Sequence, residues 1–154
     1  MHKLVMDTPL GELEIVGFDS GICEINFLHN ASSELHVQSD NPTLLKAKEQ
    51  LEEYFDGKRK QFTFPLVSEG TPFQNKVWTA LKSIPFGETW SYKDICVLIG
   101  KPKAYRAVGG ANNKNKLPIV IPCHRVIGSK GELTGYAGGL ASKEWLLEHE
   151  RSFK

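Results

Sequence analysis

Residues 91–111 read SYKDICVLIGKPKAYRAVGGA, and this stretch decides the predicted fold of the second half of the chain. Ser91 and Asp94 have the spacing of a capping box, which predicts that a short helix begins there. Glycine and proline at 100–103 end that helix, and a second short helix is predicted over 104–111. Two short helices joined by so tight a break are typical of a helix-turn-helix.

The second of these helices is rich in small residues, which let another backbone approach closely. They are Ala104, Ala107, Gly110 and Ala111. Each glycine costs about 1 kcal/mol of helix stability relative to alanine. One long cation, Arg106, projects from the same helix. Tight packing within the domain and close approach to a DNA groove both fit this composition, and flanking lysines such as Lys103 favour DNA.

An apolar run over 117–121 leads into Pro122-Cys123-His124-Arg125-Val126 and is predicted to be a buried strand. A nucleophile at the end of such a strand is held on a rigid support. The thiolate is the reactive form of cysteine, so Cys123 needs a positive or hydrogen-bonding neighbour. Adjacent side chains of a strand point to opposite faces, so His124 is expected to reach Cys123 through a water or at a bend. Alternatively, Cys123 packs as a small hydrophobic residue.

The first part of the chain is predicted to be a small α/β domain over residues 1–70, followed by a second domain over 71–154. Alternating apolar residues predict a three-stranded antiparallel meander over 1–30, whose core-facing residues are Leu13, Ile15, Ile22 and Ile25. A polar loop over 29–41, a helix over 42–56 and an edge strand over 62–66 come next, and 67–70 form the linker.

The remaining elements of the second domain are two longer helices and a hairpin. A helix over 71–84 begins at a threonine–proline cap, and the last helix runs from about Ala141 to Glu150. Residues 126–127 and 132–133 are predicted to flank a hairpin turn.

Composition places the chain among ordinary globular proteins, because 40% of its 154 residues are hydrophobic and 24% are charged. No run approaches the roughly 18 apolar residues of a membrane span, and the first residues lack a signal-peptide core. The 3 cysteines are an odd number and are scattered, which fits a reducing compartment, so a cytoplasmic location is expected.

Charge is distributed unevenly along the chain. Residues 1–70 contain six basic and twelve acidic residues, whereas residues 101–130 contain seven basic residues and no acidic one. The basic segment includes Cys123 and indicates an anionic partner such as nucleic acid. A solvated basic face is the alternative.

The candidate metal ligands of the first domain are its only cysteine and histidines, Cys23, His2, His29 and His36. Their spacing matches no common zinc pattern, so no metal is predicted. Glycine motifs that cradle phosphates are absent from the sequence, and no cofactor is expected.

The stretch Pro122–Val126 resembles the active-site signature of the O6-alkylguanine-DNA alkyltransferases, also called methylated-DNA–protein-cysteine methyltransferases. The resemblance continues, in the family's order and spacing, through residues 86–88, 91–92, 106–111, 121–126, 138–140 and 143–147. It covers residues 71–150, and residues 1–70 fit the family's variable N-terminal domain. It implies a mixed α/β (α+β) fold, with a small ribonuclease-H-like N-terminal domain and a winged-helix-like C-terminal domain that contains the helix-turn-helix.

The resemblance also implies DNA repair by direct reversal of damage. The alkyl group of O6-alkylguanine passes irreversibly to Cys123, so each molecule reacts once and needs no cofactor; O4-alkylthymine is left open as a second substrate. A monomer is expected to bind double-stranded DNA in the minor groove and to rotate the damaged nucleotide out of the helix.

The same resemblance assigns roles around the reacting atoms. His124, polarised by Glu150, takes the thiol proton through a water, and Asn115 holds the turn before the active-site segment. Tyr136 and the Val126 carbonyl bind the guanine edge, together with the backbone N–H of Ala137, where many relatives have serine. At the DNA, Tyr92 crowds the phosphate of the rotated nucleotide and Arg106 fills the gap. The other implied DNA contacts are Lys103, Ala107, Gly110 and Ser129.

Three other functions remain open from the sequence. An alkyltransferase-like protein binds damage without catalysis, but such proteins usually carry tryptophan in place of the nucleophile, and Cys123 argues against that. A helix-turn-helix regulator would use Cys123 only for packing. A cysteine hydrolase would draw its histidine from elsewhere in the chain, and His149 is the only other histidine of the C-terminal half.

Overall fold

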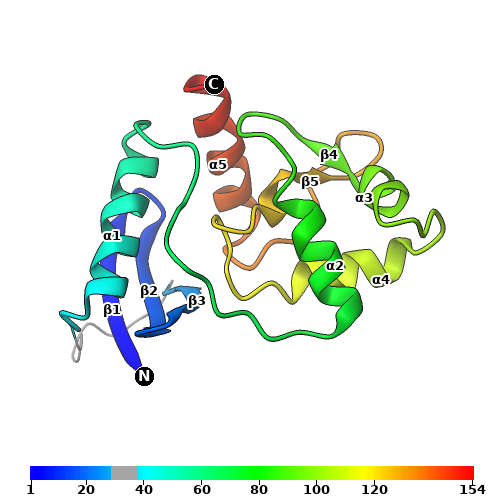
Figure 1. Cartoon of the computed structure of the whole chain (residues 1–154). Helices are drawn as coiled ribbons and strands as arrows, with labels where there is room; N and C mark the ends of the chain where they lie inside the picture. The colour runs from blue at the N-terminus through cyan, green and yellow to red at the C-terminus, as the bar shows by residue number, and fades with distance from the viewer. Residues whose placement is uncertain (29–37) are drawn as a thin grey trace. The chain divides into compact units, whose positions relative to one another are not determined.

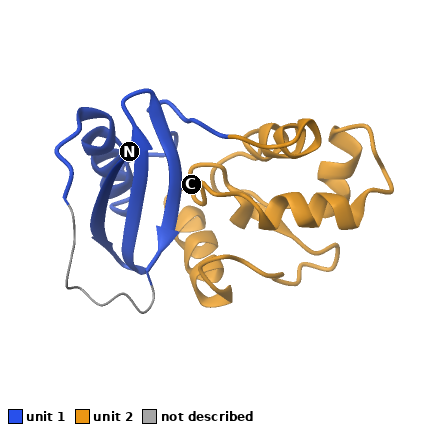
Figure 2. Cartoon of the chain, turned by 90° about the horizontal axis from the view of Figure 1, so that it is seen from below, with its two compact units in different colours: residues 1–68 blue, residues 69–154 orange. Residues whose placement is uncertain are grey.

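The computed structural model describes residues 1–28 and 38–154. The chain forms two compact units, Met1–Ser68 and Glu69–Lys154 (Figure 2). Most of the predicted polar loop over 29–41 lies outside the described residues, as do His29 and His36. No helix in the described part of the chain is long and apolar enough to cross a membrane.

The first unit is built on the predicted antiparallel meander, which the structure confirms (Figure 1). Its strands, in the spatial order of the sequence, are β1 (His2–Thr8), β2 (Gly11–Phe18) and β3 (Gly21–Phe27). Leu13, Ile15, Ile22 and Ile25 are all buried, as the alternation of the sequence predicts. Register is interrupted between Val16 and Gly17 by a bulge in the β2–β3 pairing.

One helix, α1 (Pro42–Phe55), contacts all three strands of this sheet. The Asn41 side chain accepts a hydrogen bond from the Thr43 amide and caps the helix. Leu44, Ala47, Leu51 and Tyr54 recur at helical spacing and are fully buried, so the helix seals the core of the unit.

The predicted edge strand over 62–66 is reduced to one parallel bridge between Ile22 and Leu66. Ile22 N donates to Pro65 O at 2.9 Å, and Val67 N donates to Ile22 O at 2.8 Å. Proline has no N–H to continue the ladder, so the pairing does not extend.

The second unit contains four α-helices in its described residues. They are α2 (Pro72–Leu81), α3 (Tyr92–Leu98), α4 (Tyr105–Asn113) and α5 (Leu140–Ser152). Complete capping boxes begin α2 at Thr71 and α3 at Ser91. Helices α2, α3 and α4 contact one another, and the short connection between α3 and α4 gives the predicted helix-turn-helix.

The predicted hairpin at 126–133 is wrong in its pairing. Strand β5 (Val126–Ile127) pairs in parallel with β4 (Trp90–Ser91), far away in the sequence. The turn itself exists, because Gly128 N donates to Glu132 O at 2.9 Å, but residues 132–133 form no strand. This parallel pair joins the start of α3 to the segment after Cys123 (Figure 1).

The predicted strand over 117–121 is also wrong. Leu117, Ile119 and Ile121 are each 1% exposed, but the segment is a succession of turns, and Ile119 adopts a positive φ of 76°. Proline at 118 and 122 removes two of the N–H groups that a ladder needs. The apolar run therefore predicts the burial of this segment correctly and its secondary structure incorrectly.

Candidate active site

Cys123 opens a short 3₁₀ helix, Cys123–Arg125, and is 5% exposed. Cys123 N donates to Ile121 O at 2.7 Å, and Arg125 N donates to Pro122 O at 3.0 Å. Neighbouring side chains of a 3₁₀ helix do not alternate between opposite faces as those of a strand do. The opposite placement of the two side chains was expected only for a strand, so the 3₁₀ helix fits the alternative in which His124 reaches Cys123 at a bend.

Asn115 ties together the two ends of the turn that precedes Cys123. Its Nδ2 donates to Ile121 O at 2.8 Å, and Leu117 N donates to its Oδ1 at 3.0 Å. Both bonds are buried. The Asn115 side chain also lowers the pKa of the Cys123 thiol, against the larger effect of burial. One amide therefore fixes the turn that leads to Cys123.

Glu150 of α5 binds two neighbours of Cys123 at once. Its Oε2 lies 2.7 Å from His124 Nε2, and its two oxygens accept from Arg125 Nε at 2.7 Å and Arg125 Nη2 at 3.0 Å. Arg125 Nη1 also donates to Ile84 O at 2.8 Å. His124 and Glu150 are fully buried and Arg125 is 6% exposed. The carboxylate therefore holds the 3₁₀ helix to α5.

The charges of this cluster set the protonation of His124. Burial by itself would raise the pKa of Glu150, but His124 and Arg125 hold it well below its usual range. Burial lowers the pKa of His124, and Glu150 opposes that shift. A neutral His124 that donates Nε2–H to Glu150 keeps its lone pair on Nδ1. This buried Nδ1 has no hydrogen-bond partner among the described residues, so it is available to accept a proton.

The Cys123 thiol is protonated at neutral pH. Burial raises its pKa to about 11, against the opposing effects of the Asn115 hydrogen bond and the Lys143 charge. A thiol in this state needs a base nearby before it can act as a nucleophile. His124, which follows Cys123 in the same 3₁₀ helix, is a candidate for that base.

We expect the reaction of Cys123 with iodoacetamide to be slow at neutral pH and to accelerate toward pH 11, because its pKa is about 11. An ordinary cysteine, with a pKa of about 8.5, would level off one pH unit above that value. Mass spectrometry of the Cys123 peptide after timed labelling of the folded protein measures the rate. A plateau below pH 10 would contradict the raised pKa, provided that circular dichroism shows the fold unchanged.

Tyr136 and Val126 adjoin this cluster, and Ala137 follows Tyr136 in the chain. The Tyr136 ring meets the His124 ring edge-on, with centroids 6.4 Å apart. Burial raises the pKa of Tyr136 well above its ordinary value, and the negative charges of the Cys123 thiolate, when it forms, and of Glu150 add to the effect, so its hydroxyl stays protonated. Val126 is buried, whereas Ala137 is exposed in the loop before α5.

Sequence reasoning missed two charged residues of this site. Arg125 stands inside the quoted motif, and Lys143 stands inside the 143–147 match, yet neither received a role. Lys143 is fully buried, and its Nζ donates to Val126 O at 2.7 Å. The signal that could have found Arg125 is a full charge within an apolar run, because buried charges need partners.

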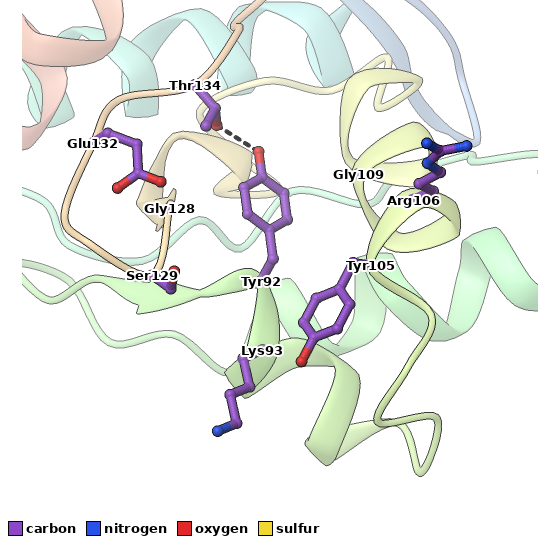
Figure 3. A pocket seen from close by; sticks show the side chains of 9 residues that line it. All are labelled: Tyr92, Lys93, Tyr105, Arg106, Gly109, Gly128, Ser129, Glu132 and Thr134. Atoms are coloured by element: carbon purple, nitrogen blue, oxygen red, sulfur yellow. Dashed lines mark hydrogen bonds between the residues drawn. The ribbon is translucent and has the colours of Figure 1, made fainter.

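A surface pocket of about 610 Å³ brings together three more of the predicted residues, Tyr92, Arg106 and Ser129 (Figure 3). Its other lining residues are Lys93, Tyr105, Gly109, Gly128, Glu132 and Thr134. Tyr92 Oη lies 2.5 Å from Thr134 Oγ1. In Figure 3 the Arg106 side chain points away from the Tyr92 ring.

The small face of α4 is only partly as predicted. Ala107 and Gly110 are exposed, as is Lys103 in the preceding turn. Ala111 is 3% exposed and its carbonyl accepts from Trp78 Nε1 at 2.8 Å, so it packs inside the unit instead. The open face thus consists of Ala107 and Gly110, with the half-buried Ala104 at its edge.

Within residues 1–28 and 38–154, no three His, Cys, Asp or Glu side chains come together in a way that would hold a metal ion. His2 instead lies 3.3 Å from Asp19 on the surface of the first unit. The candidate site is therefore built from a thiol, an imidazole, two buried cations and a carboxylate.

Two family models match the chain. Residues 1–67 match the ribonuclease-like domain of 6-O-methylguanine DNA methyltransferase, and residues 72–152 match its DNA-binding domain. Together they span nearly the whole sequence.

Individual relatives indicate the same family. The chain is 47% identical to the methylated-DNA–protein-cysteine methyltransferase of Methanosarcina barkeri, over 99% of this chain and 98% of that protein. It is 48% identical to the constitutive enzyme of that name from Bacillus subtilis, over 94% and 92% of the two chains. The crystal structure of Mycobacterium tuberculosis OGT in complex with DNA superposes with a TM-score of 0.90 at 44% identity, over 99% of this chain and 94% of that one.

Proposed function

Because this chain belongs to the methylated-DNA–protein-cysteine methyltransferase family, we propose that it repairs DNA by taking the alkyl group of O6-alkylguanine onto Cys123. One observation carries the proposal. Cys123 begins a buried 3₁₀ helix, and the next residue, His124, pairs with Glu150 at 2.7 Å. His124 Nδ1 has no hydrogen-bond partner among the described residues. That arrangement activates a nucleophile.

The proposed reaction is an in-line displacement at the alkyl carbon. His124 Nδ1 takes the thiol proton, directly or through one water molecule, and Glu150 stabilises the imidazolium that forms. The Cys123 sulfur then forms a bond to the alkyl carbon as the bond from that carbon to O6 of guanine breaks. The electron pair of the broken bond stays with the base. The thioether product has no easy leaving group, so each molecule reacts once.

Tyr136 is proposed to offset the charge that develops on the departing guanine. Its raised pKa keeps the phenolic proton available for donation to the base. The Val126 carbonyl has a second lone pair besides the one that accepts from Lys143, and this lone pair can accept from the guanine edge. The exposed Ala137 offers only its backbone N–H, because it lacks the serine hydroxyl of many relatives.

Residues 71–154 are proposed to bind double-stranded DNA as a monomer, through the helix-turn-helix and in the minor groove. The exposed Ala107 and Gly110 allow close approach of α4, and the exposed Lys103 and Ser129 are placed for phosphate contacts. Tyr92 and Arg106, in the same surface pocket, would hold the damaged nucleotide out of the helix. We further propose a cytoplasmic location and, as a second substrate, O4-alkylthymine.

The stoichiometry of repair tests this function. With excess oligonucleotide carrying O6-methylguanine, restored guanine is expected to rise to one equivalent of protein and stop there, because the thioether is stable. Digestion with a restriction enzyme that is blocked by the methyl group measures restored sites over time. Continued turnover would indicate a hydrolase. Binding of the oligonucleotide without restoration would indicate a non-catalytic, alkyltransferase-like protein.

A further inference from the structure

The hydroxyl of Thr134 joins segments of the second unit that lie far apart in the sequence. Thr134 Oγ1 is 2.5 Å from Tyr92 Oη, at the first residue of α3, and 3.4 Å from Lys143 Nζ in α5. Lys143 Nζ also donates to the carbonyls of Val126, at 2.7 Å, and Thr134, at 3.3 Å. Tyr92 and Thr134 both line the surface pocket, where Figure 3 marks their contact with a dashed line.

These contacts limit the possible directions of the hydrogen bonds. An ammonium group has three protons and no lone pair, so Lys143 can only donate to Thr134 Oγ1. A threonine hydroxyl has one proton and two lone pairs. With Lys143 on one lone pair, Thr134 either donates its proton to Tyr92 Oη or accepts from Tyr92 on its second lone pair. The positive charge of Lys143 draws electron density from the Thr134 oxygen, which makes this hydroxyl a better donor and a poorer acceptor and so favours the first arrangement. In that arrangement the phenolic proton of Tyr92 is left to point into the pocket.

We propose that Thr134 is a positioning residue: Lys143 and Thr134 form a relay that holds Tyr92 in the pocket wall with its phenolic proton turned outward. In that orientation Tyr92 donates a hydrogen bond to an anionic oxygen. The proposal rests on the function proposed above, because that oxygen belongs to a DNA phosphate beside the rotated nucleotide. Tyr92 would thereby contribute attraction as well as crowding.

The charges around the pocket fit an anionic ligand. Lys93 and Arg106 line it together with a single carboxylate, Glu132, whose Oε2 accepts from the Lys130 amide at 3.0 Å. The buried Lys143 at the inner end of the relay polarises each hydrogen bond in the same direction, which strengthens the outermost donor. Burial lowers the pKa of Lys143, and the Cys123 thiolate opposes that shift when it forms, so the cation is coupled to both the relay and the nucleophile.

A double-mutant cycle tests the relay. Thr134→Val removes the hydroxyl with little change of shape, and Thr134→Ser keeps it. We expect Thr134→Val to slow transfer from duplex DNA about two- to tenfold, the range for loss of one hydrogen bond. Thr134→Ser should stay within about twofold of the wild type. Tyr92→Phe removes the other end of the bond, so the double variant should be no slower than the slower single variant. Multiplicative effects of the two changes would overturn the proposal.

A second measurement needs no DNA and separates the relay from the proposed function. The chain has 4 tyrosines, and ¹³C labelling at their ζ carbons gives signals that respond to the hydroxyl environment. The signal lost in Tyr92→Phe identifies Tyr92. We expect Thr134→Val to shift it and Thr134→Ser to leave it near its wild-type position. A signal unmoved in Thr134→Val overturns the relay. A shifted signal in a protein that transfers no alkyl group supports the relay and refutes the proposed function.

Discussion

Cys123→Ser is expected to abolish alkyl transfer and to leave DNA binding in place. The serine hydroxyl is far less acidic than the thiol and is a weaker nucleophile in the same buried position. Its similar size should preserve the packing around a residue that is only 5% exposed. After incubation with an oligonucleotide carrying O6-methylguanine, the intact wild-type protein should gain one methylene unit in mass and the variant none. Peptide mapping should place the added group on Cys123.

The matched control is Cys23→Ser in the first unit, which should take up the methyl group at the wild-type rate. Cys23 is half-buried in β3 and belongs to a different compact unit from Cys123. Fluorescence anisotropy with the same labelled duplex measures binding by both variants. A methyl group found on Cys23 or Cys96, or methyl uptake by Cys123→Ser, would refute Cys123 as the acceptor.

Glu150→Gln is expected to reduce both stability and reactivity. The neutral amide leaves the Arg125 cation buried without a counter-charge, and breaking such a pair costs about 3–5 kcal/mol of unfolding free energy. It also removes the charge that stabilises protonated His124, so transfer should slow about 100-fold or more, the range for general-base catalysis. Urea unfolding and single-turnover transfer measure the two effects.

The loss of stability in Glu150→Gln is expected to depend on pH and to become smaller in acid. The folded-state pKa of Glu150 lies below its ordinary value of 4.5, so its ionic contribution to stability is complete above that pH and is lost as pH falls. The stability difference between wild type and Glu150→Gln should therefore shrink in acid. Glu148→Gln is the control on the same helix, because Glu148 is 70% exposed and its pair with Arg151 is worth less than about 1 kcal/mol. Equal losses in the two variants would contradict the role of Glu150.

The helices of this chain were predictable because their signals are local. Thr71 and Ser91 cap α2 and α3 through bonds to residues three positions away, and such bonds can be read from spacing. The antiparallel meander was predictable for a similar reason, since its strands are joined by tight turns and alternate with period two.

The stretch before Cys123 was mispredicted because an apolar run does not distinguish a strand from a buried turn. Leu117, Ile119 and Ile121 are as buried as the core residues of a strand. Their conformation is instead a turn, which the Asn115 side chain holds with hydrogen bonds to Ile121 O and from Leu117 N. The resemblance implies that Asn115 holds this turn, but the apolar pattern from which the strand was predicted contains no sign of it.

Local sequence signals were sufficient for the capped helices, the helix-turn-helix and the meander, and the family resemblance pointed to Cys123 and to the pairing of His124 with Glu150. The tertiary structure decided which groups surround that cysteine. Glu150 meets His124 across 26 residues, and Thr134 meets Tyr92 across 42. Such contacts arise from burial of charged and polar groups, which must find partners wherever packing places them. No local spacing encodes that choice, so the buried roles of Arg125 and Lys143 became visible only in the folded chain.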